Sequence, residues 1–271
     1  MTEEIIFTSK GPRRRSQVRK CHRGTRVRRA VDSGNWEQIA GPGRSWKNIG
    51  YKPPPKADLN DDSSSWKSYA SWTNVTGPQI CWFAASWIVP PRPLADDGQT
   101  VFLFIGVEDI GHSHIVQPVL QWGPGPSGDL KGAWSIASYW VGGDNDPLFA
   151  SEAVVVQPGD KLTGRMVLSP AYDKNDQPNG LVNCRCQFDG HPETILNAEN
   201  LPPLKICDVT LESYNVSQAA PYPPVATTAF ENMVVAFYDG SEPVVWNAEG
   251  KAEVNANGSI GAAVTVKYPS V

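Results

Sequence analysis

The sequence predicts an all-β protein built from packed antiparallel sheets. From residue 66 onward, short runs rich in Val, Ile, Thr and aromatic residues alternate with clusters of Gly, Pro, Asn and Asp. No stretch of 12 or more residues repeats its apolar positions at the 3.6-residue spacing of a helix. The ten Trp residues would fill thick sheet cores, with an aromatic-lined groove as the alternative use. Many short strands with almost no helix indicate a two-sheet β-sandwich or a barrel.

Twelve strands follow from this pattern, each bounded by turn-forming residues. We expect them at residues 68–75, 80–89, 101–107, 114–122, 133–141, 152–156, 162–168, 181–188, 205–214, 233–238, 244–247 and 262–268. Proline stands mainly at the ends of these segments, because it cannot donate a hydrogen bond to a neighbouring strand. Pro118 lies inside the segment 114–122 and indicates an edge, a bulge or a break there.

Residues 1–63 are predicted to form a disordered, largely irregular arm that is basic and rich in Pro and Ser, followed by the sandwich domain at residues 64–271. The arm has no sustained periodicity and contains Y-K-P-P-P-K at 51–56 and N-D-D-S-S-S at 60–65. Residues 1–30 hold ten of the 24 Lys and Arg but two of the 28 Asp and Glu, so this part carries about +8 and the rest about −12. We interpret the arm as a solvated tail or a removable pro-segment, with an electrostatic arm for nucleic acid or acidic membrane as the alternative.

The composition also limits the partners and the compartment. The acidic body argues against nucleic acid as a partner of the folded domain. No apolar run reaches 18 residues, so no membrane span is expected. No secretory signal peptide is visible, and the five Cys residues, an odd number, fix neither a disulfide scheme nor a compartment. Localisation and oligomeric state are therefore left open.

Several catalytic and metal-binding patterns are absent. The chain has no G-x-S-x-G elbow, no Walker loop, no dinucleotide fingerprint and no C-x-x-C pair. His112 and His114 alternate onto one strand face and could bind a metal with Glu108 or Asp109. Two histidines with one intervening residue are a weak signal, so we favour a solvated loop and predict neither a metal nor a cofactor.

Two segments carry the strongest candidate chemistry. I-V-Q-P-V-L-Q-W-G at 115–123 places Gln117 and Gln121 on one strand face. I-C-D-V-T-L-E-S-Y at 206–214 places Glu212 on one face with Asp208, Thr210 and Tyr214. A carboxyl group beside aromatic rings has its pKa raised by desolvation, which suits general acid/base work at acid pH. The alternatives are a structural carboxylate bonded to Tyr or Thr hydroxyls and a cross-strand amide ladder.

These segments resemble those of the glutamic peptidases, or eqolisins. In that family the catalytic Glu follows a cysteine by five residues, as Glu212 follows Cys207. The family's W-V-G-I-D-G is similar to F-I-G-V-E-D at 104–109, and its L-Q-T-G to L-Q-W-G at 120–123. Its T-F-T-V-P and V-T-V-T-Y are similar to S-W-I-V-P at 86–90 and V-T-V-K-Y at 264–268. The resemblance spans residues 66–268 and implies a jelly-roll, concanavalin A-like sandwich with its site on a concave sheet.

The resemblance also implies an activity and a set of site residues. Glu212 would be the general acid/base of an acid-acting endopeptidase, and Gln121 or Gln117 would donate to the oxyanion. Further substrate-binding candidates are Trp87, Phe104, Glu108, Trp122, Tyr139, Trp140 and Tyr214. The substrate would be a polypeptide, and secretion to the extracellular space would be expected. The alternatives on the same scaffold are a lectin-like binding module and a cyclase or lyase that acts on a small molecule.

Overall fold

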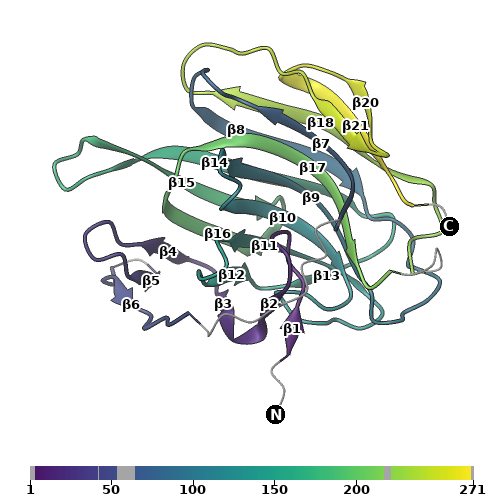
Figure 1. The fold of residues 1–271 in the computed structure, drawn as a ribbon, viewed down its shortest axis with the longest axis horizontal. Coiled ribbons are helices and arrows are strands. Elements are labelled where there is room, and N and C mark those ends of the chain that lie inside the picture. The colour runs from purple at the N-terminus through teal and green to yellow at the C-terminus, as the bar shows by residue number, and fades with distance from the viewer. Residues whose placement is uncertain (1–3, 42, 54–64, 217–220, 270–271) are drawn as a thin grey trace.

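The computed structural model describes residues 4–41, 43–53, 65–216 and 221–269. Its two large sheets confirm the all-β sandwich (Figure 1). Sheet A has nine strands, in the order β19-β7-β17-β9-β10-β11-β12-β3 with β13 paired to β11. Its strands are β3 (Val18–Cys21), β7 (Trp66–Thr73), β9 (Thr100–Asp109), β10 (Ile115–Trp122), β11 (Trp134–Val141), β12 (Leu148–Ser151), β13 (Val154–Val156), β17 (Leu204–Tyr214) and β19 (Asn247–Gly250).

Sheet B has ten strands, in the order β20-β21-β18-β8-β14-β15-β16-β4-β5-β6. They are β4 (Thr25–Arg29), β5 (Trp36–Ala40), β6 (Lys47–Asn48), β8 (Ile80–Ile88), β14 (Lys161–Tyr172), β15 (Pro178–Phe188), β16 (His191–Leu201), β18 (Thr227–Phe237), β20 (Glu253–Ala256) and β21 (Ile260–Lys267). The chain begins with a short hairpin of β1 (Ile5–Ile6) and β2 (Arg13–Arg14). The 3-10 turn Arg15–Gln17 follows and precedes the first strand of either sheet. No helix among these described segments is long and apolar enough to cross a membrane.

The main core lies between the two sheets and follows the two-residue alternation of strands. On β17, Cys207, Val209 and Leu211 point into this core. On β10, Val116 and Leu120 do the same, so the faces predicted for these two segments are confirmed. The residues between them point outward from sheet A.

The N-terminal part differs from the predicted irregular arm. Within residues 4–41 and 43–53, the chain forms strands that extend both sheets: β3 pairs with β12, and β4 with β16. Both pairings are parallel, whereas the other strand pairs of the two sheets are antiparallel. Val27 and Cys21 are buried in the core. Alternating Arg residues hid this β pattern, because their charged ends stay on the surface while Val27 faces inward. Residues 54–63 of the predicted arm lie outside the described residues.

Other strands also differ from the prediction: β12 and β20 were not predicted, and the segment predicted at 244–247 begins as β19 only at Asn247. β10 lies between β9 and β11, so Pro118 is not on an edge, although the pairing with β9 is interrupted at Gln117 and Pro118. β16 was missed because few of its residues are apolar. It turns the small or apolar Thr194, Leu196 and Ala198 inward and leaves polar groups outside.

Candidate functional site

The outer face of sheet A carries a second apolar cluster, separate from the core between the sheets. It includes Phe102 and Phe104 from β9, Val119 from β10, Tyr139 from β11 and Tyr214 from β17. The outward face of an antiparallel sheet is normally in contact with solvent, so another segment must shield these apolar side chains from water. Residues 4–17 supply part of it, and Phe7 stacks on the Tyr214 ring at a centroid distance of 4.4 Å.

The segment that covers this face is held by specific polar contacts. The Tyr214 hydroxyl donates to the main-chain oxygen of Thr8 over 2.6 Å, and the Gln117 amide donates to Ser9 Oγ over 2.8 Å. Lys10 Nζ donates to Glu108 Oε2 over 2.7 Å. Glu108 is 1% exposed and the Lys10 side chain 15%, so this ion pair is largely buried and the segment is a built part of the face.

Arginine side chains anchor the end of the same segment. Arg15 donates to the main-chain oxygens of Gly125 and Pro126, each over 3.1 Å. The buried Arg13 pairs with Asp144 over 3.0 Å. These contacts use several charges of the basic run as internal anchors.

The two candidate glutamines differ in how many hydrogen bonds their side-chain amides already make. Gln121 accepts from the Tyr139 hydroxyl and donates to the main-chain oxygens of Gly123 and Gly128, over 2.6, 2.7 and 2.8 Å. Its amide is therefore fully occupied in holding the loop after β10. Gln117 donates to Ser9, and its Oε1 atom has no partner among the described residues. Gln117 is thus the glutamine that would be released if residues 4–17 moved away.

Glu212 is completely buried, and burial raises its pKa to about 7. The Tyr214 hydroxyl lies 2.6 Å from both Glu212 Oε1 and the Thr8 carbonyl oxygen. A hydroxyl has one proton, so it cannot donate to both at once. When Glu212 is protonated, the acid donates to Tyr214, which then donates to Thr8. Protonation of Glu212 thus favours the attachment of the covering segment.

The register of β17, β9 and β10 shows which acidic residue of β17 lies in the same row across the sheet as which glutamine of β10. Glu212 pairs with Phe102, which pairs with Gln121, so the Phe102 side chain stands between them on this face. Asp208 pairs with Gly106, and the β9–β10 register places Gln117 beyond Gly106. Asp208 and Gln117 are therefore two strands apart, about 10 Å between Cα atoms. Gly106 itself has no side chain, and the Ile115 side chain lies over it on this face. Glu212 and Gln117 are two strands apart as well, but their rows are four residues apart along β9, so they lie farther from each other than Asp208 and Gln117 do.

Asp208 was not among the predicted site residues, but its surroundings mark it as chemically unusual. Burial and the nearby Glu108 raise the pKa of Asp208 well above its usual range, and Lys10 opposes this rise. Its Oδ2 atom has no hydrogen-bond partner among the described residues. The signal in the sequence was the alternation itself, which puts Asp208 on the face of Glu212. Lys10 and Ser9 had no such signal, because nothing local shows that residues 4–17 reach this face.

The predicted binding residues divide between two environments. Phe104, Glu108, Tyr139 and Tyr214 lie on the outer face of sheet A, the face that also carries Glu212.

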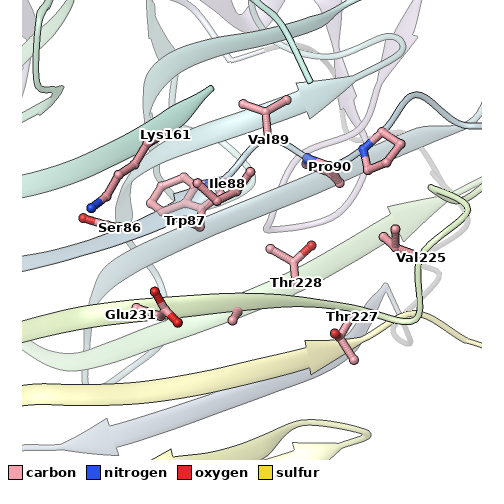
Figure 2. A pocket seen from close by; sticks show the side chains of 12 residues that line it. Ser86, Trp87, Ile88, Val89, Pro90, Lys161, Val225, Thr227, Thr228 and Glu231 are labelled. Atoms are coloured by element: carbon pink, nitrogen blue, oxygen red, sulfur yellow. The ribbon is translucent and has the colours of Figure 1, made fainter. Parts of the chain in front are cut away.

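Trp87, Trp122 and Trp140 lie instead in the core between the sheets. Trp140 follows Tyr139 and Trp122 follows Gln121, and successive strand residues point to opposite faces. Trp87 belongs to β8 of sheet B and borders a separate cavity of about 250 Å³ (Figure 2). The three tryptophans therefore cannot line the face that carries Glu212.

The two histidines near this face make polar contacts with acidic residues. His112 Nδ1 lies 2.8 Å from Glu108 Oε2, and His114 is 3.8 Å from both Asp109 and Asp146. Among the described residues, no group of three or more His, Cys, Asp or Glu side chains is placed to hold a metal ion.

Comparison with known proteins finds likeness in structure and none in sequence. No protein-family model matches the chain, and no curated protein matches it. A scytalidoglutamic peptidase with a transition-state analogue has a TM-score of 0.44 and 10% identity, over 76% of this chain and 98% of that one. The eqolisin SCP-B with the tripeptide Ala-Ile-His has a TM-score of 0.43 and 10% identity, over 75% and 98%.

Proteins of a different activity also match. The alginate lyase vAL-1 from a Chlorella virus has a TM-score of 0.31 and 9% identity, over 90% of this chain and 91% of that one. TM-scores of this size do not decide an activity, so the chemistry proposed below is argued from the side chains alone.

Proposed function

We propose that the outer face of sheet A binds extended polypeptide and hydrolyses amide bonds at acid pH. The observation that supports this most directly is that the face already holds a stretch of polypeptide, residues 4–17. The contacts with Phe7, the Thr8 carbonyl and Lys10 combine an aromatic stack, a main-chain hydrogen bond and an ion pair. A peptide substrate would use the same three kinds of contact.

In this proposal the acid–amide pair is Asp208 with Gln117. Displacement of residues 4–17, together with a rotation of the Ile115 side chain away from Gly106, would admit water between them. Hydration would lower the pKa of Asp208 from its raised value, so that the ionised form becomes available at mildly acid pH. Ionised Asp208 would take a proton from the attacking water and return it to the leaving amine, while the Gln117 amide donates to the oxyanion.

Glu212 remains the second candidate for the acid, as the sequence resemblance implies. Its pKa of about 7 makes it a proton donor at acid pH. Its partner in the same row is Gln121, whose amide is already fully bonded. We therefore assign Glu212 a supporting role, in which its protonation sets the hydrogen bond of Tyr214 to the covering segment.

The test is a peptidase assay on the full chain from about pH 2 to 8, using an unfolded protein substrate. The wild type is compared with Asp208→Asn, Glu212→Gln and Gln117→Ala, and with Phe7→Ala, which loosens the cover. We expect acid-peaked cleavage that is faster in Phe7→Ala, is lost in Asp208→Asn, and falls about 10²–10³-fold in Gln117→Ala.

The acid variants distinguish the two assignments. Loss of cleavage in Glu212→Gln with activity kept in Asp208→Asn would transfer the role to Glu212. Absence of cleavage by both the wild type and Phe7→Ala at every pH would contradict a hydrolase function for this face.

A further inference from the structure

The outer face of sheet B, on the other side of the sandwich, has an open groove that the proposed hydrolase site does not use. Its volume is about 450 Å³, which lies within the usual range of ligand sites. Strands β8, β14, β15 and β16 form its floor, and its polar lining includes Trp82, Arg165, Arg185, Gln187 and Asn197.

The register aligns part of this lining in a single row across the sheet. Trp82 pairs with Val167, Val167 with Arg185, and Arg185 with Asn197. Three strand spacings separate the two ends of the row, a length of about 14 Å. Asn197 in turn pairs with Arg26 of β4, so the row continues on the N-terminal segment.

Two arginines give the groove its charge, and both are held in place. Arg185 donates from Nε to Oε1 of the buried Gln187 over 2.9 Å. Arg185 is exposed and has no ion-pair partner among the described residues, although Glu199 shares the groove lining. Arg165 lies over the Trp82 ring at 5.4 Å and pairs with Asp189 over 2.9 Å.

We propose that this groove binds a carboxylated sugar chain, such as a polymer of uronic acid. The terminal N–H groups of Arg185 match a carboxylate in a bidentate manner. Asn197 Nδ2 already donates to the Thr25 carbonyl, which leaves Asn197 Oδ1 to accept from a sugar hydroxyl. Asn183 Oδ1 already accepts from the Asn200 N–H, which leaves Asn183 Nδ2 to donate to one. The half-buried Trp82 ring offers a flat apolar surface for the C–H face of a sugar ring.

The acidic groups around the groove argue for a sparsely charged ligand. Asp189 pairs with Arg165, and Glu199 pairs with Arg26 at the rim. The whole chain carries a net charge of −4. Duplex nucleic acid, with one negative charge for about every 1.7 Å of its axis, would bring many charges to a groove with few cations, whereas a single uronic acid chain has one carboxylate on each sugar together with neutral hydroxyls.

The test is isothermal titration of the full chain with oligogalacturonate, beside its fully methyl-esterified form as the neutral counterpart. We expect saturable binding of the acid form that weakens about 10–100-fold in Arg185→Ala, because one charge-assisted contact is lost. Trp82→Ala should weaken binding as well. Arg92→Ala is the matched control, since Arg92 is exposed and outside the groove, and it should leave binding unchanged.

Three results would overturn the proposal. Equal binding of the methyl ester would exclude carboxylate recognition, and equal loss in Arg92→Ala would indicate non-specific attraction to positive charge. Absence of binding to oligogalacturonate at low ionic strength would exclude this ligand class. Asp208→Asn should bind normally, which separates this proposal from the hydrolase proposal.

Discussion

The outward faces of the two sheets follow the same two-residue alternation but have opposite surroundings. On sheet A, residues 4–17 help to cover the face, and Glu108, Asp208 and Glu212 are at most 2% exposed. On sheet B, Arg185 is exposed in an open groove. The comparison shows that a sheet face acquires unusual chemistry when another segment removes its polar groups from water. Burial raises the pKa of Asp208 and of Glu212, and open solvent would remove this cause.

The largest expected effect concerns the buried ion pair on sheet A. Lys10→Met should lower the free energy of unfolding by about 3–4 kcal/mol, near the low end for a broken buried pair, because Glu108 would keep a buried charge with His112 as its remaining partner. Chemical denaturation measures this change. The double variant Lys10→Met with Glu108→Gln should recover most of the stability, and no recovery would show that Lys10 stabilises the fold in another way.

The next effect is a pH dependence carried by Glu212. Its pKa is raised from 4.5 to about 7 in the folded chain, so the folded state holds a proton that the unfolded state releases earlier. Stability contributed by this group is therefore fully present below about pH 4.5 and falls as the pH rises to 7. The loss is about 3 kcal/mol, at about 1.4 kcal/mol for each pKa unit.

Glu212→Gln gives the matched control for this titration. The glutamine amide is neutral and of the same size, so the free energy of unfolding of this variant should fall by about 3 kcal/mol less than that of the wild type between pH 4.5 and 7. Thermal unfolding at a series of pH values measures it. An unchanged slope in the variant would assign the dependence to other groups, of which Asp208 is the first to test.

A smaller effect is expected at the aromatic contact of the cover. Phe7→Ala removes a half-buried ring from Tyr214 and should cost about 1–2 kcal/mol. Hydrogen exchange at residues 4–17 should accelerate more than exchange in β9 or β17. Ile5→Ala, at a position 37% exposed, should change little. Equal effects of the two substitutions would mean that Phe7 is not a specific anchor.

The smallest effect is expected on the open face of sheet B. Arg185→Ala should change the free energy of unfolding by less than about 0.5 kcal/mol, because its guanidinium is solvated and its described partner is Gln187. Chemical denaturation beside Lys10→Met makes the comparison direct. A loss as large as that of Lys10→Met would remove the distinction between the two faces.

The sequence predicted those features that depend on local pattern. Alternation correctly placed Val209 and Leu211 in the core and Glu212 and Tyr214 outside it. It failed for the N-terminal strands, whose burial depends on parallel pairing with β12 and β16, far along the chain. It also could not pair Asp208 with Gln117, because that relation depends on the register of three strands around Gly106. Trp140 was misplaced by grouping it with its neighbour Tyr139 rather than by following the alternation.

The central claim is that the outer face of sheet A is a peptide-binding face and residues 4–17 are its internal occupant. The most direct measurement is fluorescence anisotropy of a labelled peptide with the sequence of residues 4–17, added to full-length wild type and to Phe7→Ala. We predict saturable binding that is tighter to Phe7→Ala and is lost when the peptide carries Ala in place of its Phe and Lys. If hydrogen exchange shows the segment opened in Phe7→Ala and the peptide still does not bind, the face is not a peptide-binding site.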